Sequence, residues 1–429
     1  MSAIYADFGP TDVEETKLPS GLDDFYDKIE EIRQRHLITQ ALWTAGLTVA
    51  AITVKPLLAC AVAVIGVAYL VYRATLPSKP PYLILSIDGG GVRGIIPATI
   101  LALIEEEVGA KPGELFDCIA GTSIGGVLAL ALAQDKSATY CLKFLKDTAP
   151  RIFERSITWR TQTVEGLAGP KYSDEVLAAT VKKEFGEAKI GDSKTDVLVT
   201  GVDIGRHAGL VFFHFHNVET QSNPLLLDVA LATSAAPTYF PSHPVDKFNV
   251  IDGGLWANNP ALVAYQMVTR FVRCEEDDHI FILSLGTGSS AKQPIPAKDS
   301  AGWGIVSWLP RLFDVLIEQM ERNVEYNIQT LGKRANIHFM RLQPKLPSPA
   351  LEPLDNADPA NLAALEKVAR DYFKDLLDQG LREKLIDPLK KYRLKCERAA
   401  VAAPTIRIVD VHGRASIVAE ARLPRWWNW

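Results

Sequence analysis

A serine lies between two glycines in the segment GTSIG, which has the GxSxG pattern of a nucleophile elbow around Ser123. Residues 115–120 before it are apolar and residues 127–133 after it are rich in alanine, which predicts a strand, a sharp turn and a helix. Gly121 and Gly125 remove side chains that would clash in such a turn, and the helix dipole favours negative charge beside Ser123. The pattern predicts a covalent nucleophile, with an ordinary strand-to-helix turn as the alternative.

A glycine-rich loop precedes this elbow in the sequence. Residues 82–87 have the apolar pattern of a buried strand and residues 95–108 that of a helix, with the segment DGGGVRG between them. Backbone amides of such a loop can form an oxyanion hole, and a cation in it adds positive potential. The residues predicted to do this are Gly89, Gly90, Gly91 and Arg93. A nucleotide phosphate loop is the alternative, but the Gly-Lys-Ser/Thr ending of a Walker motif is missing.

A serine hydroxyl needs a base, and none of the 8 histidines is well placed to be one. In the order Ser, Asp, His of a common hydrolase fold, the histidine would follow Asp252. His279 and His338 stand beside apolar strand patterns, and His412 lies in a polar tail. His214 and His216 alternate within one predicted strand.

Asp252 is a better candidate because it ends the apolar run 248–251 and is followed by Gly253 and Gly254. Catalytic groups of open parallel sheets gather at the carboxyl ends of strands, which is where this pattern puts the carboxylate. The segment therefore predicts a Ser123–Asp252 dyad, in which the weak base works by its position. The alternative is a plain Asp-Gly-Gly turn.

Together these segments resemble the patatin-like phospholipase family over about residues 80–392. Further matching segments follow in the family's order: KYS from Lys171, ATSAAPTYFP from Ala232, WANNP from Trp256 and SLGTG from Ser284. The resemblance implies a three-layer α/β/α sandwich of patatin type. It also implies Ser123 as nucleophile, Asp252 as base, the loop amides as oxyanion donors and an acyl-serine intermediate, with no metal, cofactor or histidine.

Composition agrees with an enzyme that carries a large core. The chain has 429 residues, of which 48% are hydrophobic and 23% charged, and its net charge of −5 gives no reason to expect nucleic acid as a partner. Its 5 cysteines lack the paired spacing of a zinc site and are expected to be reduced core residues.

The N-terminal part extends beyond the resemblance. Residues 1–36 are acidic, residues 37–74 are strongly apolar, and residues 75–81 form a proline-containing linker. The expected catalytic domain is 82–395, followed by a tail, 396–429, to which we assign no role.

The apolar segment predicts a helical hairpin that turns at Lys55-Pro56 and enters a membrane. Basic residues flank both ends, Arg33 and Arg35 before it and Arg73 and Lys79 after it, which predicts that the catalytic domain lies on the cytoplasmic side. One kinked span is a second geometry, and a soluble helix pair packed on protein is the alternative to membrane contact.

Other elements follow from periodicity. Residues 141–153 and 173–185 are expected to be helices, and residues 196–202 and 211–215 strands. An apolar patch, residues 302–310, is expected to precede a helix with one apolar face. In that patch Trp303 and Trp308 contact lipid headgroups or pack in the core, and the basic run 382–398 is a solvated helix face or meets anionic lipid.

The sequence thus predicts a membrane-associated serine hydrolase that cleaves fatty acyl esters of glycerophospholipids. Two alternatives stay open: a latent lipid-binding or scaffold protein that keeps the fold without turnover, and a defence effector that a signal switches on. A homo-oligomer or a small-molecule activator also stays open as a partner of this protein.

Overall fold

The computed structural model describes residues 31, 34–35, 38–39, 66–67, 81–154, 169–216, 218–219, 222–273, 279–289, 295–332 and 336–393. The predicted acidic segment, apolar hairpin, linker and C-terminal tail lie almost entirely outside these residues. Among the helices of the described part, none is both long enough and apolar enough to cross a bilayer.

One sheet of eight strands forms the centre of the described chain, in the order β5-β6-β3-β2-β1-β7-β8, with β4 also paired to β3. The strands β3, β2, β1, β7 and β8 run parallel to one another, whereas β4 and β6 pair antiparallel with β3 and β5 pairs antiparallel with β6. The strands are β1 (Tyr82–Ile87), β2 (Cys118–Gly121), β3 (Asp196–Asp203), β4 (Ala208–His214), β5 (His243–Val245), β6 (Phe248–Asp252), β7 (Ile280–Leu285) and β8 (Ile337–Leu342).

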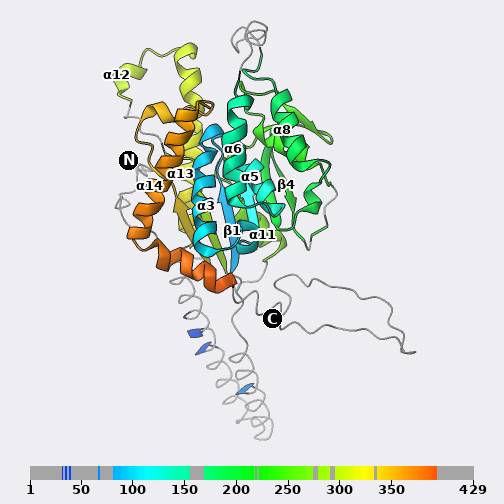
Figure 1. The fold of residues 1–429 in the computed structure, drawn as a ribbon, viewed down its shortest axis with the longest axis vertical. Helices are drawn as coiled ribbons and strands as arrows, with labels where there is room; N and C mark the ends of the chain where they lie inside the picture. Colours follow the sequence, from blue (N-terminus) through cyan, green and yellow to red (C-terminus); the bar gives the residue numbers. More distant parts are fainter. Residues whose placement is uncertain are drawn as a thin grey trace, which may run out of the picture.

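Helices cover both faces of the sheet, which confirms the predicted three-layer α/β/α architecture (Figure 1). One layer contains α3 (Ile95–Val108), α5 (Ile124–Ala133), α6 (Ala138–Ile152), α8 (Glu175–Phe185), α9 (Leu226–Ser234) and α14 (Pro359–Asp378). The other contains α10 (Gly254–Ala257), α11 (Ala261–Phe271) and α13 (Ile305–Gly332). The short elements are η1 (Gly91–Gly94), α4 (Pro112–Leu115), η3 (Ile190–Asp192), α12 (Ala297–Ser300), η4 (Pro349–Leu351) and the π-helix η5 (Arg382–Ile386).

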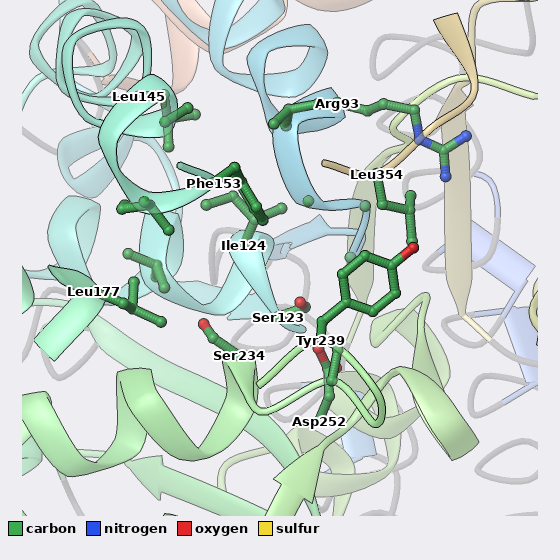
Figure 2. A pocket seen from close by; sticks show the side chains of 18 of the residues that line it. Arg93, Ser123, Ile124, Leu145, Phe153, Leu177, Ser234, Tyr239, Asp252 and Leu354 are labelled. Atoms are coloured by element: carbon green, nitrogen blue, oxygen red, sulfur yellow. The ribbon is translucent and has the colours of Figure 1, made fainter. Parts of the chain in front are cut away.

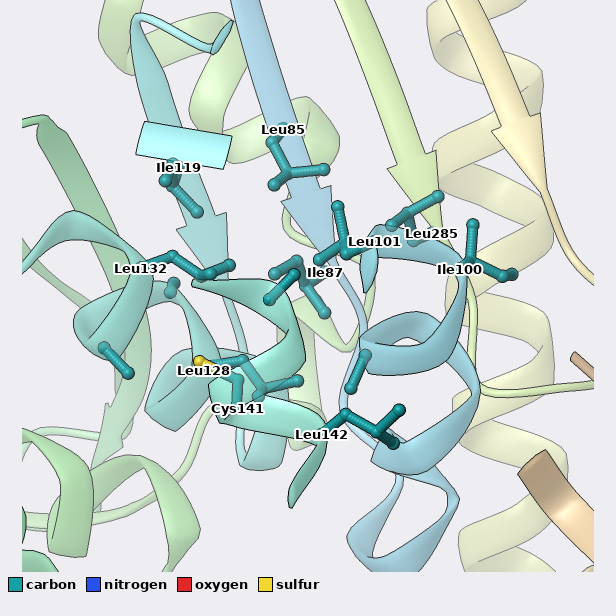
Figure 3. Close-up of a cluster of buried hydrophobic side chains, with 14 of the residues drawn as sticks. Leu85, Ile87, Ile100, Leu101, Ile119, Leu128, Leu132, Cys141, Leu142 and Leu285 are labelled. Atoms are coloured by element: carbon teal, nitrogen blue, oxygen red, sulfur yellow. The ribbon is translucent and has the colours of Figure 1, made fainter. Parts of the chain in front are cut away.

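Successive residues of the central strands point to opposite layers, because side chains alternate along a strand. In β1, Leu83, Leu85 and Ile87 belong to the core beneath α3 and α5, whereas Tyr82 and Ile84 belong to the core beneath α11 and α13. Figure 3 shows the first of these cores at the contact between the strands and the helices. Burial on both faces explains why β1 is a continuous apolar run.

Some predicted boundaries were wrong for local reasons. The helix expected at 141–153 begins at Ala138, because the Ser137 side chain caps it by accepting a hydrogen bond from the Tyr140 amide at 3.0 Å. The strand expected at 211–215 is β4, which begins three residues earlier, at Ala208. The reason is a tight hairpin with β3, in which Asp203 accepts a hydrogen bond from the Gly205 amide at 3.0 Å.

The patch 302–310 does not precede a helix but contains its first turns. The Ser307 and Trp308 amides donate to the Gly304 carbonyl at 3.1 and 3.0 Å, so α13 begins directly after that glycine. Of the basic run 382–398 the structure describes residues up to Arg393, and two of its arginines contact α3 or the glycine that follows it. Arg382 pairs with Glu107 of α3 at 2.8 Å, and Arg393 donates to the Gly109 carbonyl at 2.5 Å. Of the cysteines in the described residues, Cys118 and Cys141 are buried and free.

Candidate active site

Ser123 sits at the turn between β2 and α5, with φ 55° and ψ −127°. This left-handed backbone conformation is unusual for a residue with a side chain and is typical of a strained functional turn. A Cβ atom at Gly121 would lie 2.0 Å from the Gly125 carbonyl oxygen, so the turn closes only with glycine there. The predicted elbow residues are therefore brought together by the fold as expected.

Neighbouring hydroxyl groups hold the elbow in place. The Ser123 amide donates to the Thr233 hydroxyl oxygen at 2.9 Å, and the Thr122 hydroxyl donates to the Ala257 carbonyl at 2.6 Å. Thr122 and Thr233 are fully buried. Because these partners come from α9 and α10, the position of Ser123 is fixed by elements on both sides of the sheet.

Asp252 is the last residue of β6 and lies in the same site, with 5% of its surface exposed. Its carboxyl group accepts a hydrogen bond from the Gly254 amide at 2.7 Å, and the Ser123 side chain lies in the same pocket (Figure 2). Burial raises its pKa to about 6, and the Ser123 hydroxyl and the Gly254 amide oppose the rise. A carboxylate with this pKa is a stronger base than an exposed aspartate and is still mostly ionised at neutral pH. Gly253 and Gly254 turn the chain from β6 into α10.

The glycine loop passes beside the serine. A Cβ atom at Gly89 would lie 3.2 Å from the Ser123 Cβ, which measures how closely the two segments approach. The Gly89 amide donates to the Asn258 carbonyl at 3.2 Å. The amides of Gly90 and Gly91 have no acceptor among the residues that the structure describes. Gly91 has φ +56°, and a Cβ there would lie 2.0 Å from the Leu354 carbonyl oxygen.

Arg93 follows this loop in η1 and contributes to the wall of the pocket that contains Ser123. Figure 2 shows its side chain extending past Leu354 and away from Ser123. The side chain thus contributes positive charge at the pocket wall, and its membership of an oxyanion hole stays a prediction.

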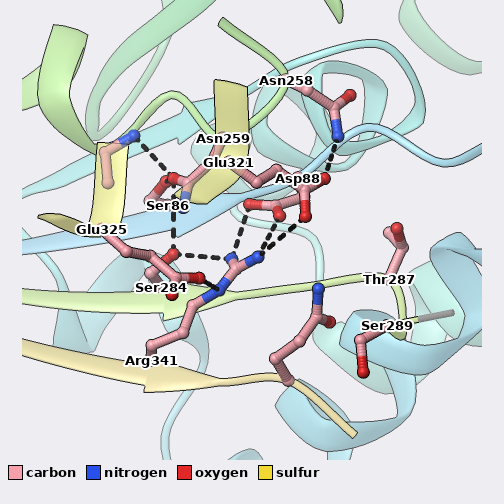
Figure 4. Close-up of polar contacts among 12 residues, drawn as sticks. Ser86, Asp88, Asn258, Asn259, Ser284, Thr287, Ser289, Glu321, Glu325 and Arg341 are labelled. Carbon is pink, nitrogen blue, oxygen red and sulfur yellow. Dashed lines mark hydrogen bonds and ion pairs between the residues drawn. The ribbon is translucent and has the colours of Figure 1, made fainter. Parts of the chain in front are cut away.

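Arg341 of β8 anchors the start of the glycine loop, and the sequence patterns did not identify it. Its guanidinium holds both carboxyl oxygens of Asp88, at 2.8 and 2.5 Å, and donates to the Ser284 hydroxyl at 2.9 Å (Figure 4). Asp88 is fully buried; burial raises its pKa to about 7, and the Arg341 guanidinium opposes the rise. The two-point contact fits an ionised carboxylate.

Two glutamates of α13 complete this buried cluster. Glu325 accepts a hydrogen bond from the Arg341 Nε at 3.1 Å, and Glu321 lies 3.7 Å from the same guanidinium. Glu321 also accepts from the Asn258 side-chain amide at 2.6 Å, and that amide approaches the Gly89 carbonyl at 3.4 Å. Helix α13 is therefore connected through side chains to the loop beside Ser123.

Ser123 and Asp252 line the same apolar pocket (Figure 2). Its wall includes Leu145, Phe153 and Leu177, which come from α6, α8 and the segment between them. No histidine is among the described residues that line it. His279 directly precedes the first residue of β7, at the opposite end of that strand from the glycine loop. The arrangement offers a nucleophile, a base and backbone amides next to an apolar space.

Comparison with known proteins shows which family this chain belongs to. The family profile described as patatin-like phospholipase matches residues 85–265. Patatin-like protein 2 of Arabidopsis thaliana is 30% identical over 401 residues, which cover 80% of this chain and 98% of that relative. The chain belongs to the patatin-like phospholipase family.

Other similarities are more limited. Patatin-like protein 2 of Oryza sativa subsp. indica is 35% identical over 266 residues, 53% of this chain, and the match spans 65% of that relative's length. Among solved structures, the crystal structure of VipD from Legionella pneumophila matches 76% of both chains with a TM-score of 0.31 and 12% identity, which is too weak to support any inference.

Proposed function

We propose that this patatin-like phospholipase hydrolyses fatty acyl esters of glycerophospholipids through Ser123 and Asp252. The Ser123 oxygen attacks the ester carbonyl while its proton passes to the Asp252 carboxylate. The amides of Gly90 and Gly91 donate to the developing oxyanion, a type of contact whose loss typically costs about 3 kcal/mol of transition-state stabilisation. The alcohol leaves with the proton, and water then cleaves the acyl-serine by the same route, releasing the fatty acid.

The observation that carries this proposal is the position of Ser123 and Asp252 together in one apolar pocket, where the serine hydroxyl lowers the pKa of the carboxyl group. The raised pKa of Asp252, about 6, supports its role as the base because proton transfer is more favourable to a more basic carboxylate. The positive φ of Ser123 supports its role as the nucleophile because elbows of this type present the hydroxyl to the substrate.

The pocket supports a fatty acyl chain as the bound part of the substrate. Phe240 and Phe153 have ring centroids 6.0 Å apart and contact Tyr172, so one wall is a packed aromatic cluster. Such a wall gives an alkyl chain favourable contacts and offers a charged headgroup none. The products are a fatty acid and a lysolipid, or a fully deacylated headgroup when both esters are cleaved.

We further propose that the enzyme is membrane-associated, with its catalytic domain at the cytoplasmic surface. The apolar segment 37–74 and its basic flanks support this location. The acidic segment 1–36 precedes it, the linker 75–81 follows it, and residues 82–395 form the proposed catalytic domain.

The test is to incubate the full-length protein with a mixture of phospholipids and to identify the products by mass. We expect Ser123→Ala and Asp252→Asn to lower fatty acid release by roughly a thousandfold or more each, because the two residues act as a unit. Ser234→Ala is the matched control, since Ser234 lines the same pocket and is expected to be dispensable. Full activity of either dyad variant would refute the assignment. Bound but intact phospholipid on the unmodified protein would favour the latent lipid-binding alternative.

A further inference from the structure

Helix α13 carries apolar side chains on the side that faces away from the protein. Trp308, Leu312, Val315 and Leu316 are 42%, 44%, 42% and 47% exposed. We call these four residues the α13 apolar face. Their spacing of i, i+4, i+7 and i+8 puts them on one side of the helix. Further along this side Gln319, Arg322 and Asn323 are exposed and polar and Tyr326 is 49% exposed, so the aliphatic residues of this side lie in the first half of α13.

The opposite side of the same helix belongs to the active site. Ile317 follows Trp308 by about two and a half helical turns and lines the pocket. Further along that side, Glu321 accepts the hydrogen bond from Asn258, and Val324 and Ile328 are buried. Helix α13 therefore forms part of the pocket wall on one side and carries the α13 apolar face on the other.

Aromatic and basic groups surround this face. The rings of Trp303 and Trp308 meet edge to face at 5.2 Å, and the Arg311 guanidinium lies 4.5 Å from the Trp303 ring. Ile295, before α12, is 50% exposed, and α12 contains both Lys298 and Asp299. Figure 1 shows α12 and the beginning of α13 beyond the strands at one end of the molecule. Exposed aliphatic groups with tryptophan and mixed charges at their edge are typical of helices that lie in a membrane interface.

We propose that the α13 apolar face inserts into the surface of a phospholipid bilayer and places the pocket mouth at the membrane. The proposal rests on the proposed function, because a phospholipid is supplied to Ser123 from a bilayer. The tryptophans and the Arg311 guanidinium at the edge of this face favour lipid over a protein partner, because helices in a membrane interface combine such groups with exposed aliphatic side chains.

The first measurement locates Trp308 in the membrane with the full-length protein. Trp308 is one of 8 tryptophans, so its fluorescence is taken as the difference between the parent protein and Trp308→Phe. Phosphatidylcholine vesicles with brominated acyl chains should quench this difference signal, and unbrominated vesicles should not. This readout does not depend on catalysis or on attachment through another segment. Equal signals in both kinds of vesicle would overturn the proposal.

The second measurement compares two substrates. We expect Leu312→Glu/Leu316→Glu to lower hydrolysis of phosphatidylcholine vesicles by roughly tenfold or more, because two apolar side chains no longer enter lipid. Hydrolysis of a short-chain ester in free solution should change by less than about twofold. Val176→Glu on α8 is the control, since Val176 is similarly exposed, at 42%, and should affect neither substrate.

Unchanged vesicle hydrolysis by the doubly charged variant would overturn the proposal. A change in its oligomeric mass without a change in vesicle hydrolysis would also overturn it, and would identify a second copy of the chain as the occupant of this face. If the parent protein hydrolyses neither substrate, the proposed function fails, while quenching of Trp308 still decides whether the face docks on lipid.

Discussion

The Arg341 guanidinium donates hydrogen bonds to both carboxyl oxygens of Asp88, the residue immediately before the glycine loop. The pair is almost completely buried, with the Arg341 side chain 10% exposed and that of Asp88 not exposed. Strand β8 does not pair with β1, because β7 lies between them. The contact between Arg341 and Asp88 therefore connects the glycine loop, which follows β1, to a more distant strand of the sheet. The geometry beside Ser123 thus depends on a residue that does not line the pocket.

We expect Arg341→Met to reduce the free energy of unfolding by about 3–5 kcal/mol, because it leaves the Asp88 charge buried without its partner. Arg341→Lys keeps a charge but loses the planar fork, so we expect a smaller loss of stability with a roughly tenfold to hundredfold fall in kcat. Urea unfolding and steady-state kinetics measure the two effects. Arg370→Lys, in the half-exposed pair with Glu366, is the control and should cost under about 1 kcal/mol. Normal kcat in Arg341→Lys would show that the loop does not need this anchor.

The pKa of Asp252, about 6, predicts the pH dependence of hydrolysis. Above this pH the carboxylate is ionised and can accept the serine proton; below it the group is protonated and cannot. We therefore expect kcat/KM for a non-ionising ester to level off above about pH 7 and to fall roughly tenfold per pH unit below the midpoint. A midpoint near the ordinary aspartate value of about 4 would contradict the effect of burial.

Gly91 should tolerate no side chain, because it combines φ +56° with contact to the Leu354 carbonyl. We expect Gly91→Ala to destabilise the fold by roughly 1–3 kcal/mol and to reduce turnover by displacing the loop amides. Gly302→Ala is the matched control, since a Cβ there meets no atom within 4 Å. Unfolding and ester hydrolysis should be measured together. Wild-type activity in Gly91→Ala would show that the amides of the glycine loop do not take part in the reaction.

Leu177 lines the pocket and its neighbour Val176 faces outward, which allows a direct test of the acyl site. We expect Leu177→Phe to lower kcat/KM for long acyl chains by roughly tenfold relative to short ones, because a larger side chain shortens the available space. Val176→Phe should leave the chain-length profile unchanged. Competition between esters of different length, with products resolved by mass, gives the profile. An unaltered chain-length profile in Leu177→Phe would show that the acyl chain does not bind beside Leu177.

Local sequence patterns predicted the parts of this site that are local in the fold. The GxSxG segment indicated the turn at Ser123, and the apolar run before Asp252 correctly predicted that it ends a strand. Arg341 and Glu321 gave no such signal, because an arginine within a strand and a glutamate within a helix are ordinary until the sheet order brings them together. The beginning of α13 was missed because Gly302, Gly304 and Pro310 resemble a loop in sequence.

Strand β6 is joined to β3 over only three residue pairs, from Gly201↔Asp252 to Asp203↔Val250. Ser123, in contrast, follows β2, which lies within the parallel set. The two residues of the proposed dyad are therefore expected to differ in how readily their strands open locally. We expect β6 to detach more readily than the parallel strands, which would separate Asp252 from Ser123 while those strands stay paired. Amide hydrogen exchange at Ile251 and Asp252 should then be faster than in β1 and β2.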